Sequence, residues 1–376
     1  MSLRVLVVDD SAVFRRVISQ ALASLPDVEV VGSVSNGKLA LERVRELHPD
    51  LLTLDLEMPE MDGLGVLDAL LQAGETVPAI VVSALTRQGS RATLRALEKG
   101  AFDFITKPDL GSAEQSREAI LQELAPRLRA LANRIEVRKI LRAKPVAPPT
   151  PSVTSKGPVP PRPPIENLDG VAGRMNRLAK PGKPEMVLIG VSTGGPSALA
   201  RLLPALPRDL GVPVLIVQHM PPVFTQSLAE SLAGKCAIGV REAVHGEAIQ
   251  PNTAYLAPGG KQMRLVAGPD AAKVLQITDD PPENNCRPAV DYLFRSVANH
   301  FPGRAAAVIL TGMGSDGTLG LRLLKRHGCF VIAQDELSCV VYGMPKAAVE
   351  AGVTDLVLPI EAIGPRLTQF VRGGVL

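Results

Sequence analysis

The sequence predicts an α/β protein in which two doubly wound parallel sheets are joined by a proline-rich linker. Two long regions of the 376-residue chain alternate short β-branched runs with helical patterns, which is typical of parallel sheets covered by helices. Between them, residues 142–184 lose apolar periodicity and are dominated by proline and small polar residues, a composition that stiffens a chain without building a core. The length suits two domains, and an apolar fraction of 46% is enough for buried cores.

The predicted elements follow the same rhythm in both regions. In the first region we expect strands at 3–8, 28–33, 51–54, 79–82 and 102–105, with helices at 12–25, 37–47, 63–71, 91–99 and from 112 toward 141. In the second region we expect strands at 186–189, 214–217, 254–257, 305–310 and 330–333, with helices such as 197–203 and 318–326. We therefore expect a first domain at 1–125, a helical extension and basic linker at 126–184, and a second domain at 185–376.

The net charge of +3 is unevenly distributed along the chain. Residues 1–130 contain 14 Lys and Arg against 19 Asp and Glu, residues 131–184 contain 11 against 3, and residues 185–376 contain 16 against 16. The basic excess therefore belongs to the linker, and neither flanking domain has the basic excess of a DNA-binding domain. Three Tyr, eight Phe and no Trp also leave few platforms for stacking bases. We expect no nucleic-acid partner.

The cysteines and the apolar runs exclude further classes of protein. Four widely spaced cysteines form no C-x-x-C pair, which argues against a zinc site or a disulfide framework, and we interpret them as small buried apolar residues. No apolar run approaches the roughly 18–20 residues of a membrane span, so we expect no membrane insertion. The chain opens directly on a strand-like run without a signal-peptide pattern, and we expect a cytoplasmic protein.

Polar side chains follow the strands of the first domain at the points where these strands end. Asp9 and Asp10 follow the first strand, Asp55 the third, Ser83 the fourth and Lys107 the fifth. Doubly wound sheets place their chemistry outside these carboxyl ends, so the side chains should converge. Three converging carboxylates repel one another, suit Mg²⁺ as hard oxygen ligands, and include a possible phosphoryl acceptor. Taken singly, acids that follow a strand are more often helix caps, and a lysine at a strand end is more often a surface residue. Their joint occurrence favours a site for Mg²⁺ and phosphoryl transfer.

Four stretches at these positions resemble the receiver domain of two-component response regulators over about residues 1–125. They are VLVVDDS, LDLEMPEMDG, VVSALT and GAFDFITKP. The resemblance implies a flavodoxin-like sheet and a cognate histidine kinase as phosphodonor. It also implies roles for individual residues: Asp55 as phosphoacceptor, Asp9, Asp10, Asp55 and the backbone carbonyl of Glu57 as Mg²⁺ ligands, Ser83 and Lys107 as the switch pair, and Phe104 as the switch aromatic.

A glycine-rich turn after the first strand of the second domain carries a candidate nucleophile, Ser192. The strand runs into Gly-Val-Ser-Thr-Gly-Gly-Pro at residues 190–196, followed by a helical pattern. Pro196 suits the start of a helix, and the free N–H groups of a helix N-terminus can hold an oxyanion. On its own, this turn is more typical of a phosphate or nucleotide cradle, or of a simple helix cap.

Two further residues favour the nucleophile. His219 follows a strand in Gln-His-Met-Pro, and Asp316 follows another strand in a glycine-rich turn before a helix. Ser192, His219 and Asp316 should therefore meet at one edge of the sheet, as nucleophile, base and orienting group. Residues 190–194 also fit the G-x-S-x-G pattern of α/β-hydrolases. Those enzymes have the order Ser, Asp, His, so the order found here disfavours their topology.

About residues 184–370 resemble the catalytic domain of the chemotaxis protein-glutamate methylesterases. The resemblance is carried by IGVSTGGP, VQHMPP, YLAPGG, CRPAVDYLF, ILTGMGSDGTLGL and VVYGMPKAA. It implies phosphorylation-regulated hydrolysis of glutamate γ-methyl esters on cytoplasmic helices of chemoreceptors, and deamidation of receptor glutamines through the same acyl-enzyme chemistry. It also implies that the unphosphorylated receiver covers the catalytic edge of the second domain.

The resemblance places the ester chemistry on Ser192, His219 and Asp316, without a cofactor. We place the oxyanion hole at backbone N–H groups near Thr193 and Met313. Three other functions remain open at this point. A phospho-dependent binding module with an inactive output domain would need no Ser–His–Asp set. A general small-ester hydrolase would need a deep apolar acyl pocket. A DNA-binding regulator would need a basic output region.

Overall fold

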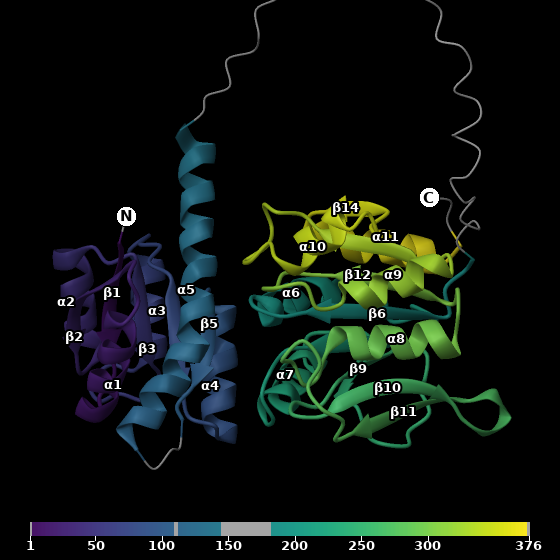
Figure 1. Ribbon diagram of the computed structural model, residues 1–376, viewed down its shortest axis with the longest axis horizontal. Helices are drawn as coiled ribbons and strands as arrows, with labels where there is room; N and C mark the ends of the chain where they lie inside the picture. Colours follow the sequence, from purple (N-terminus) through teal and green to yellow (C-terminus); the bar gives the residue numbers. More distant parts are fainter. Residues whose placement is uncertain (1, 109–111, 144–181, 374–376) are drawn as a thin grey trace, which may run out of the picture.

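The computed structural model describes residues 2–108, 112–143 and 182–373. It contains two α/β units that lie side by side (Figure 1). The predicted linker falls largely on residues 144–181, which lie outside the described residues. In the described parts of the chain, no helix combines the length and the apolar character that a membrane span requires.

The first unit is built on a five-stranded parallel sheet with the order β2-β1-β3-β4-β5. Its strands are β1 (Leu3–Val8), β2 (Val28–Val34), β3 (Leu51–Asp55), β4 (Ala79–Ser83) and β5 (Asp103–Thr106). Because β1 pairs with both β2 and β3, the winding of the sheet reverses between β1 and β3, the position where doubly wound sheets bind ligands. The predicted flavodoxin-like sheet is confirmed.

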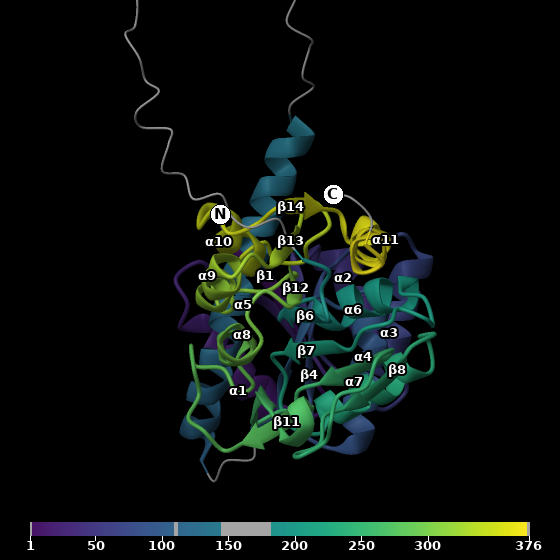
Figure 2. The ribbon, with the colours of Figure 1, turned by 90° about the vertical axis from the view of Figure 1, so that its right-hand side faces the viewer.

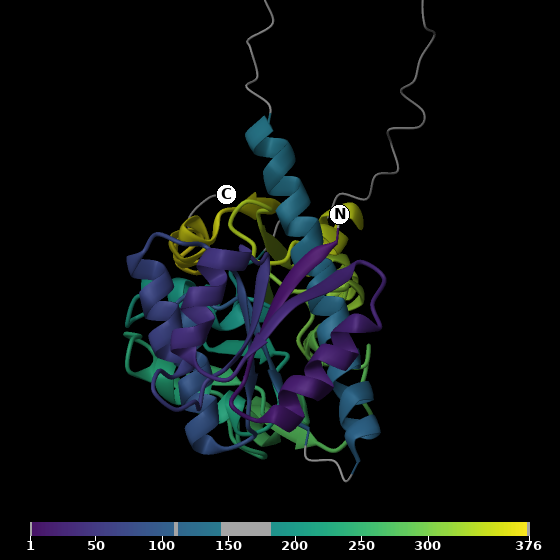
Figure 3. The ribbon, with the colours of Figure 1, turned by 90° about the vertical axis from the view of Figure 1, so that its left-hand side faces the viewer.

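Helices cover both faces of this sheet. They are α1 (Ala12–Ala23), α2 (Gly37–Leu47), α3 (Gly63–Gln72), α4 (Arg87–Glu98) and α5 (Ala113–Ala143). The first four begin after a Ser, Asn, Asp or Thr side chain that accepts a hydrogen bond from an N–H of the first turn, which satisfies an otherwise unpaired donor. α1 and α5 pack on one face, and α2, α3 and α4 on the other. Figure 3 shows that α5 continues well beyond the sheet.

The second unit is built on a seven-stranded parallel sheet with the order β14-β13-β12-β6-β7-β9-β8. Its strands are β6 (Met186–Val191), β7 (Val214–Gln218), β8 (Gly239–Glu242), β9 (Thr253–Leu256), β12 (Ala305–Ile309), β13 (Phe330–Gln334) and β14 (Leu356–Leu358). The five predicted strands are present. The sequence pattern does not predict the edge strands β8 and β14, or the separate antiparallel hairpin of β10 (Gln262–Ala267) and β11 (Lys273–Thr278).

Two helical layers enclose the second sheet (Figure 2). The helices are α6 (Gly195–Leu202), α7 (Phe224–Ala233), α8 (Val290–His300), α9 (Thr318–Arg326), α10 (Met344–Glu350) and α11 (Ile360–Val371). α6, α7 and α11 pack on one face of the sheet, and α8, α9 and α10 on the other. The central strands β6, β7, β12 and β13 are therefore buried on both sides, and their carboxyl ends lie at one edge of the sheet.

The two units contact each other through the α4, β5 and α5 side of the first unit (Figure 1). α4 packs against α6 and α7 of the second unit. Phe104 stacks on Phe224, with ring centroids 4.6 Å apart, and the apolar core continues from one unit into the other. The hydroxyl groups of Ser90 and Ser227 lie 2.7 Å apart at the same interface.

Candidate functional site

The strand ends of the first unit bring the predicted phosphoacceptor group together. Asp9, Asp10 and Asp55 each offer a carboxylate oxygen, and these three oxygens lie within 4.8 Å of one another. Lys107 Nζ lies 2.7 Å from Asp55 Oδ2 and 2.9 Å from Asp9 Oδ2. A cavity of about 170 Å³ adjoins them and is lined by Asp10, Asp55, Leu56, Glu57, Ser83, Ala84, Gly89 and Lys107.

Lys107 supplies the positive charge that these carboxylates need. Burial alone would lower the pKa of Lys107, but its hydrogen bonds with Asp55 and Asp9 outweigh burial and raise that pKa. Burial raises the pKa of Asp9, although the lysine opposes the shift. Carboxylates and a backbone carbonyl are the hard oxygen donors that Mg²⁺ prefers, so the residues present fit that ion.

Ser83 and Phe104 lie between the phosphoacceptor group and the second unit. Ser83 is buried, lines the cavity next to Asp55, and donates through Oγ to the carbonyl of Gly89 in α4 (3.3 Å). Phe104 is 6% exposed and stacks on Phe224 of α7. Ser83 thus connects the cavity beside Asp55 with α4, and α4 packs against the second unit.

Ser192, His219 and Asp316 follow three neighbouring strands of the second sheet. Ser192 follows β6, His219 follows β7, and Asp316 lies between β12 and α9. His219 Nε2 lies 2.8 Å from Asp316 Oδ2, and the His219 N–H donates to the carbonyl of Val191 (3.2 Å). The structure thus brings the three predicted catalytic residues to the same edge of the sheet.

Asp316 is held by hydrogen bonds to both of its carboxylate oxygens. Oδ2 accepts from the Val290 N–H (2.7 Å) as well as facing His219. Oδ1 accepts from the Asp291 N–H (3.0 Å) and from Asn284 Nδ2 (2.8 Å). Burial would raise the pKa of Asp316, but the imidazole and these N–H donors outweigh burial and lower it. Asp316 is therefore an ionised, fixed acceptor.

His219 is 14% exposed, and both of its ring nitrogens face a partner. Nε2 faces Asp316, and Nδ1 lies 3.6 Å from Cys286 Sγ. Burial opposes the charged imidazole, but Asp316 and Cys286 outweigh burial and raise the pKa of His219 to about 9. Within the described chain, Ser192 Oγ makes no hydrogen bond to the ring. In this arrangement the imidazole carries a proton on both ring nitrogens at neutral pH. It must lose one of these protons before it can act as a base.

The turns around Ser192 leave backbone donors for an oxyanion. Gly194 has a φ of 76° and precedes the first residue of α6, a left-handed conformation that glycine adopts without strain. The Ser192 N–H donates to the carbonyl of Thr311 (3.0 Å). By contrast, the N–H groups of Thr193 and Met313 donate to no acceptor in the described chain, so both predicted oxyanion donors are available.

The prediction that Cys286 is a small buried apolar residue is wrong. Cys286 is half-buried, and its Sγ faces the imidazole of His219. The loop that carries it lies between the β10–β11 hairpin and α8. No spacing motif connects Cys286 to His219, and only the tertiary fold brings them together.

Two other residues support the catalytic turns without any signal in the sequence. Asn284 Nδ2 donates to both Asp316 and Asp291, which ties the orienting carboxylate to α8. Thr311 is buried at the end of β12, and its hydroxyl donates to the carbonyl of Thr193 (2.9 Å). The same hydroxyl accepts from the Val341 N–H (3.0 Å). Thr311 therefore fixes the turn that follows Ser192 against a neighbouring loop.

The first unit also contacts the catalytic turn directly. Thr193 Oγ1 donates to Asp103 Oδ2 (3.0 Å), and Asp103 is itself held by Arg127 Nε (2.9 Å). Ser197 Oγ, in the first turns of α6, donates to the carbonyl of Leu97 at the end of α4 (2.9 Å). The residue next to the candidate nucleophile is therefore tied to the first unit.

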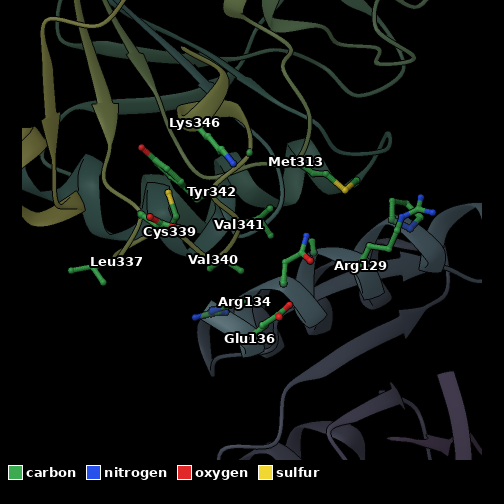
Figure 4. Close-up of a pocket in the computed structure, with 15 residues that line it drawn as sticks. Arg129, Arg134, Glu136, Met313, Leu337, Cys339, Val340, Val341, Tyr342 and Lys346 are labelled. Atoms are coloured by element: carbon green, nitrogen blue, oxygen red, sulfur yellow. The ribbon is translucent and has the colours of Figure 1, made fainter. Parts of the chain in front are cut away.

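A cavity of about 640 Å³ lies between α5 and the catalytic turns. Figure 4 shows Arg129, Arg134 and Glu136 on the α5 side of this cavity, with Met313 and Tyr342 among the residues on the other side. Met313, a candidate oxyanion residue, thus lines this interdomain cavity together with residues of α5.

Comparisons with known proteins account for both units. Residues 5–116 match the family model described as response regulator receiver domain, and residues 187–367 match the model described as CheB methylesterase. A protein-glutamate methylesterase/protein-glutamine glutaminase from Desulfotalea psychrophila is 48% identical over 373 residues, which cover 99% of each chain. The chain belongs to the protein-glutamate methylesterase/protein-glutamine glutaminase family. Relatives of the same name from Nocardioides sp. and Alkalilimnicola ehrlichii are 42% and 40% identical over 98% of this chain, and over 95% and 100% of theirs.

Both resemblances drawn from the sequence are confirmed by membership of this family. The receiver match contains Asp55, and the methylesterase match contains Ser192, His219 and Asp316. The receiver match ends at residue 116, within α5, and the methylesterase match begins within β6. The C-terminal part of α5, which lines the interdomain cavity, belongs to neither matched region.

Proposed function

We propose that this protein hydrolyses γ-methyl esters of glutamate side chains on chemoreceptors, deamidates receptor glutamines, and is controlled by phosphorylation of Asp55. The observation that supports the esterase assignment most strongly is the pairing of His219 Nε2 with the fixed carboxylate of Asp316 at 2.8 Å, one strand away from Ser192. The name shared by the relatives supplies the substrate class.

In the proposed reaction, Ser192 Oγ attacks the ester carbonyl while neutral His219 takes its proton. The developing oxyanion is held by the N–H groups of Thr193 and Met313, where one donor contributes about 3–4 kcal/mol. His219 then protonates the leaving methanol, and water attacks the acyl-enzyme to release glutamate and free Ser192. An amide substrate follows the same route with ammonia as the leaving group.

The arrangement described here corresponds to the inactive chain. His219 Nδ1 faces Cys286 rather than Ser192, and Thr193 is tied to Asp103 of the receiver. For catalysis, the imidazole must lose a proton and turn its free nitrogen toward Ser192. Undocking of the receiver would release Thr193 and open the catalytic edge to a receptor helix.

The proposed switch is phosphorylation of the receiver by a cognate histidine kinase. Asp9, Asp10, Asp55 and the backbone carbonyl of Glu57 would hold the Mg²⁺ that this step uses, and the ion would supply positive charge to offset that of the carboxylates and of the incoming phosphoryl group. Ser83 and Lys107 would then contact the phosphoryl oxygens. Lys107 already contacts Asp55, so the larger movement is that of Ser83, which leaves the carbonyl of Gly89 in α4. This movement reshapes α4 and the neighbouring β5, and with them the stacking of Phe104 on Phe224.

We assign residues 1–125 to the receiver, 126–184 to the extension and linker, and 185–376 to the catalytic domain. The substrate is a methylated helix on the cytoplasmic side of a chemoreceptor, which places the enzyme in the cytoplasm with no nucleic-acid partner. The ester chemistry needs no cofactor, because hydroxyl, base, carboxylate and oxyanion donors all come from the chain.

Methanol release from methylated receptor tests the esterase assignment. We expect release by the phosphorylated wild-type chain and almost none by Ser192→Ala. Ser315→Ala is the matched control, because Ser315 is an exposed serine in the neighbouring turn whose hydroxyl makes no hydrogen bond within the described chain. A binding module with an inactive catalytic domain would release no methanol in any variant. Full release by Ser192→Ala would contradict the covalent mechanism.

A further inference from the structure

The imidazole of His219 and the thiol of Cys286 form a pair of donors suited to a metal ion. The distance between His219 Nδ1 and Cys286 Sγ is 3.6 Å. A tetrahedral Zn²⁺ ion with Zn–N of about 2.0–2.1 Å and Zn–S of about 2.3 Å separates such atoms by about 3.5 Å. The two donor atoms are therefore already at the spacing that one zinc ion would require.

We propose that His219 and Cys286 form an inhibitory binding site for a borderline-soft divalent cation, with Zn²⁺ as the ion that fits best. The inhibitory effect rests on the proposed function, because it depends on His219 acting as the base. Nδ1 carries the free lone pair when Nε2–H donates to Asp316. A metal ion on Nδ1 occupies the lone pair that would otherwise take the proton of Ser192.

The surroundings of His219 match those of a metal-bound histidine. Such a histidine almost always donates its second N–H to a carboxylate, which fixes the ring orientation. Here Nε2 faces Asp316 Oδ2 at 2.8 Å, and the Val290 N–H holds that same oxygen. The ring is thus oriented toward the thiol before any ion arrives.

Cys286 differs from the other cysteines of the described chain in facing a histidine. Cys329 and Cys339 are buried, and burial raises the pKa of both thiols. Cys236 is half-buried, and burial raises its pKa to about 11. Cys286 and His219 both remain partly exposed, so an ion has access to the pair.

Binding releases the thiol proton of Cys286, the Nδ1 proton of the charged His219 imidazole and two metal-bound waters, and it forms a Zn–S and a Zn–N bond, with water completing the coordination. The receiver carboxylates are unlike this pair, because they offer only hard oxygen donors that suit Mg²⁺. The two sites therefore select different cations, and saturating Mg²⁺ leaves the thiol–imidazole pair open to Zn²⁺.

Zinc titration of methylesterase activity tests the inhibitory effect. Full-length wild type, Cys286→Ala and Cys236→Ala are assayed for methanol release in saturating Mg²⁺ at buffered free Zn²⁺, and each rate is normalised to that variant's own zinc-free rate. We expect Cys286→Ala to need at least about tenfold more Zn²⁺ for half-inhibition, because one of two protein ligands is lost. Cys236→Ala should titrate like wild type, and a chelator should restore activity. Equal zinc sensitivity of wild type and Cys286→Ala, or no inhibition of wild type, would overturn the proposal.

Cobalt binding tests the site without relying on turnover. Co²⁺ bound to a thiolate gives a sulfur-to-metal charge-transfer absorption, which oxygen ligands do not produce. We expect this absorption in wild type and Cys236→Ala and its loss in Cys286→Ala, with Cys286→Ser as a size-matched second variant. If methanol release failed in every chain but the absorption appeared, the metal site would stand and the proposed function would fall. Absence of the absorption in wild type would reject the site itself.

Discussion

Asp103 of the receiver accepts a hydrogen bond of 3.0 Å from the hydroxyl of Thr193, the residue that follows the candidate nucleophile. Asp103 begins β5, and the next residue, Phe104, stacks on Phe224 of the catalytic domain. One short strand therefore joins the predicted switch aromatic to the turn that carries Thr193, a predicted oxyanion donor. This connection gives the receiver a direct structural route to the catalytic turn.

Replacing Asp103 by Ala should raise the activity of the unphosphorylated chain. A hydrogen bond of this kind contributes about 0.5–1.5 kcal/mol net, so we expect the methanol-release rate without phosphodonor to rise roughly 2–10-fold. Asp68→Ala is the control, because Asp68 pairs with Lys99 within the receiver. An unchanged basal rate in Asp103→Ala would show that this contact does not hold the catalytic turn.

Phe104 and Phe224 should act on the docked state as a pair. Stacked aromatic rings contribute about 0.5–1.5 kcal/mol beyond their buried area. Phe104→Leu and Phe224→Leu should each raise the basal rate, and the double variant should gain less than the product of the single effects. A double-mutant cycle on basal methanol release measures this coupling. Strictly multiplicative effects would mean that the stacking does not control docking.

Ser192 and His219 should fail as a unit. Ser192→Ala and His219→Ala should each remove nearly all ester hydrolysis, and combining them should cost little more, because neither group works without the other. Turnover of the two single variants and the double variant, with circular dichroism to confirm folding, checks this. If the loss of turnover in the double variant equalled the product of the two single losses, a shared step would be excluded.

Asp316→Asn should reduce activity by a factor on the order of 10³–10⁴, because an amide no longer stabilises the charged imidazole or selects its tautomer. The new amide also places its N–H₂ group against the N–H of either Val290 or Asp291, because these two donors bond different oxygens of Asp316. Asn284→Ala should cost less, since it removes one of the donors that hold Asp316. The turnover numbers of the two variants decide this order. Comparable activity of Asp316→Asn and wild type would show that another group orients His219.

The stability of the chain should fall as the pH rises from about 6.5 to about 9. Burial opposes the His219 cation, but Asp316 and Cys286 outweigh it and raise the folded-state pKa from 6.5 to about 9. The charged pair is therefore fully stabilising below pH 6.5, and on the order of 3 kcal/mol is lost as the pH rises through 9.

Denaturant unfolding at pH 6 and pH 9.5 measures this loss. The free energy of unfolding should fall more between the two pH values for wild type than for His219→Gln. The basal esterase rate should rise over the same range as His219 becomes neutral. Identical pH dependence of unfolding in the two chains would contradict this assignment of the proton.

The predictable parts of this molecule are those set by local pattern and by parallel topology. β6 and β12 are buried on both faces and appear in the sequence as short apolar runs. Once such strands are placed, the residues that follow them must share an edge, which is why Ser192, His219 and Asp316 could be grouped in advance.

The remaining features depend on contacts between distant segments. β8 and β14 are sheet edges with partly exposed residues, so their apolar signal is weak. Cys286 lies 67 residues from His219, and Asp103 lies 90 residues from Thr193. No local periodicity specifies how these loops and domains close on one another.

The central claim, that phosphorylation of Asp55 releases the catalytic edge, is tested most directly by methanol release from methylated receptor with and without a small-molecule phosphodonor. Wild type and Asp55→Asn are compared at equal concentration in saturating Mg²⁺. A coupling free energy of about 1–3 kcal/mol predicts that the donor accelerates wild type roughly 5–150-fold and leaves Asp55→Asn at its basal rate. Equal stimulation of both chains, or no stimulation of wild type that has been shown to be phosphorylated, would contradict the account.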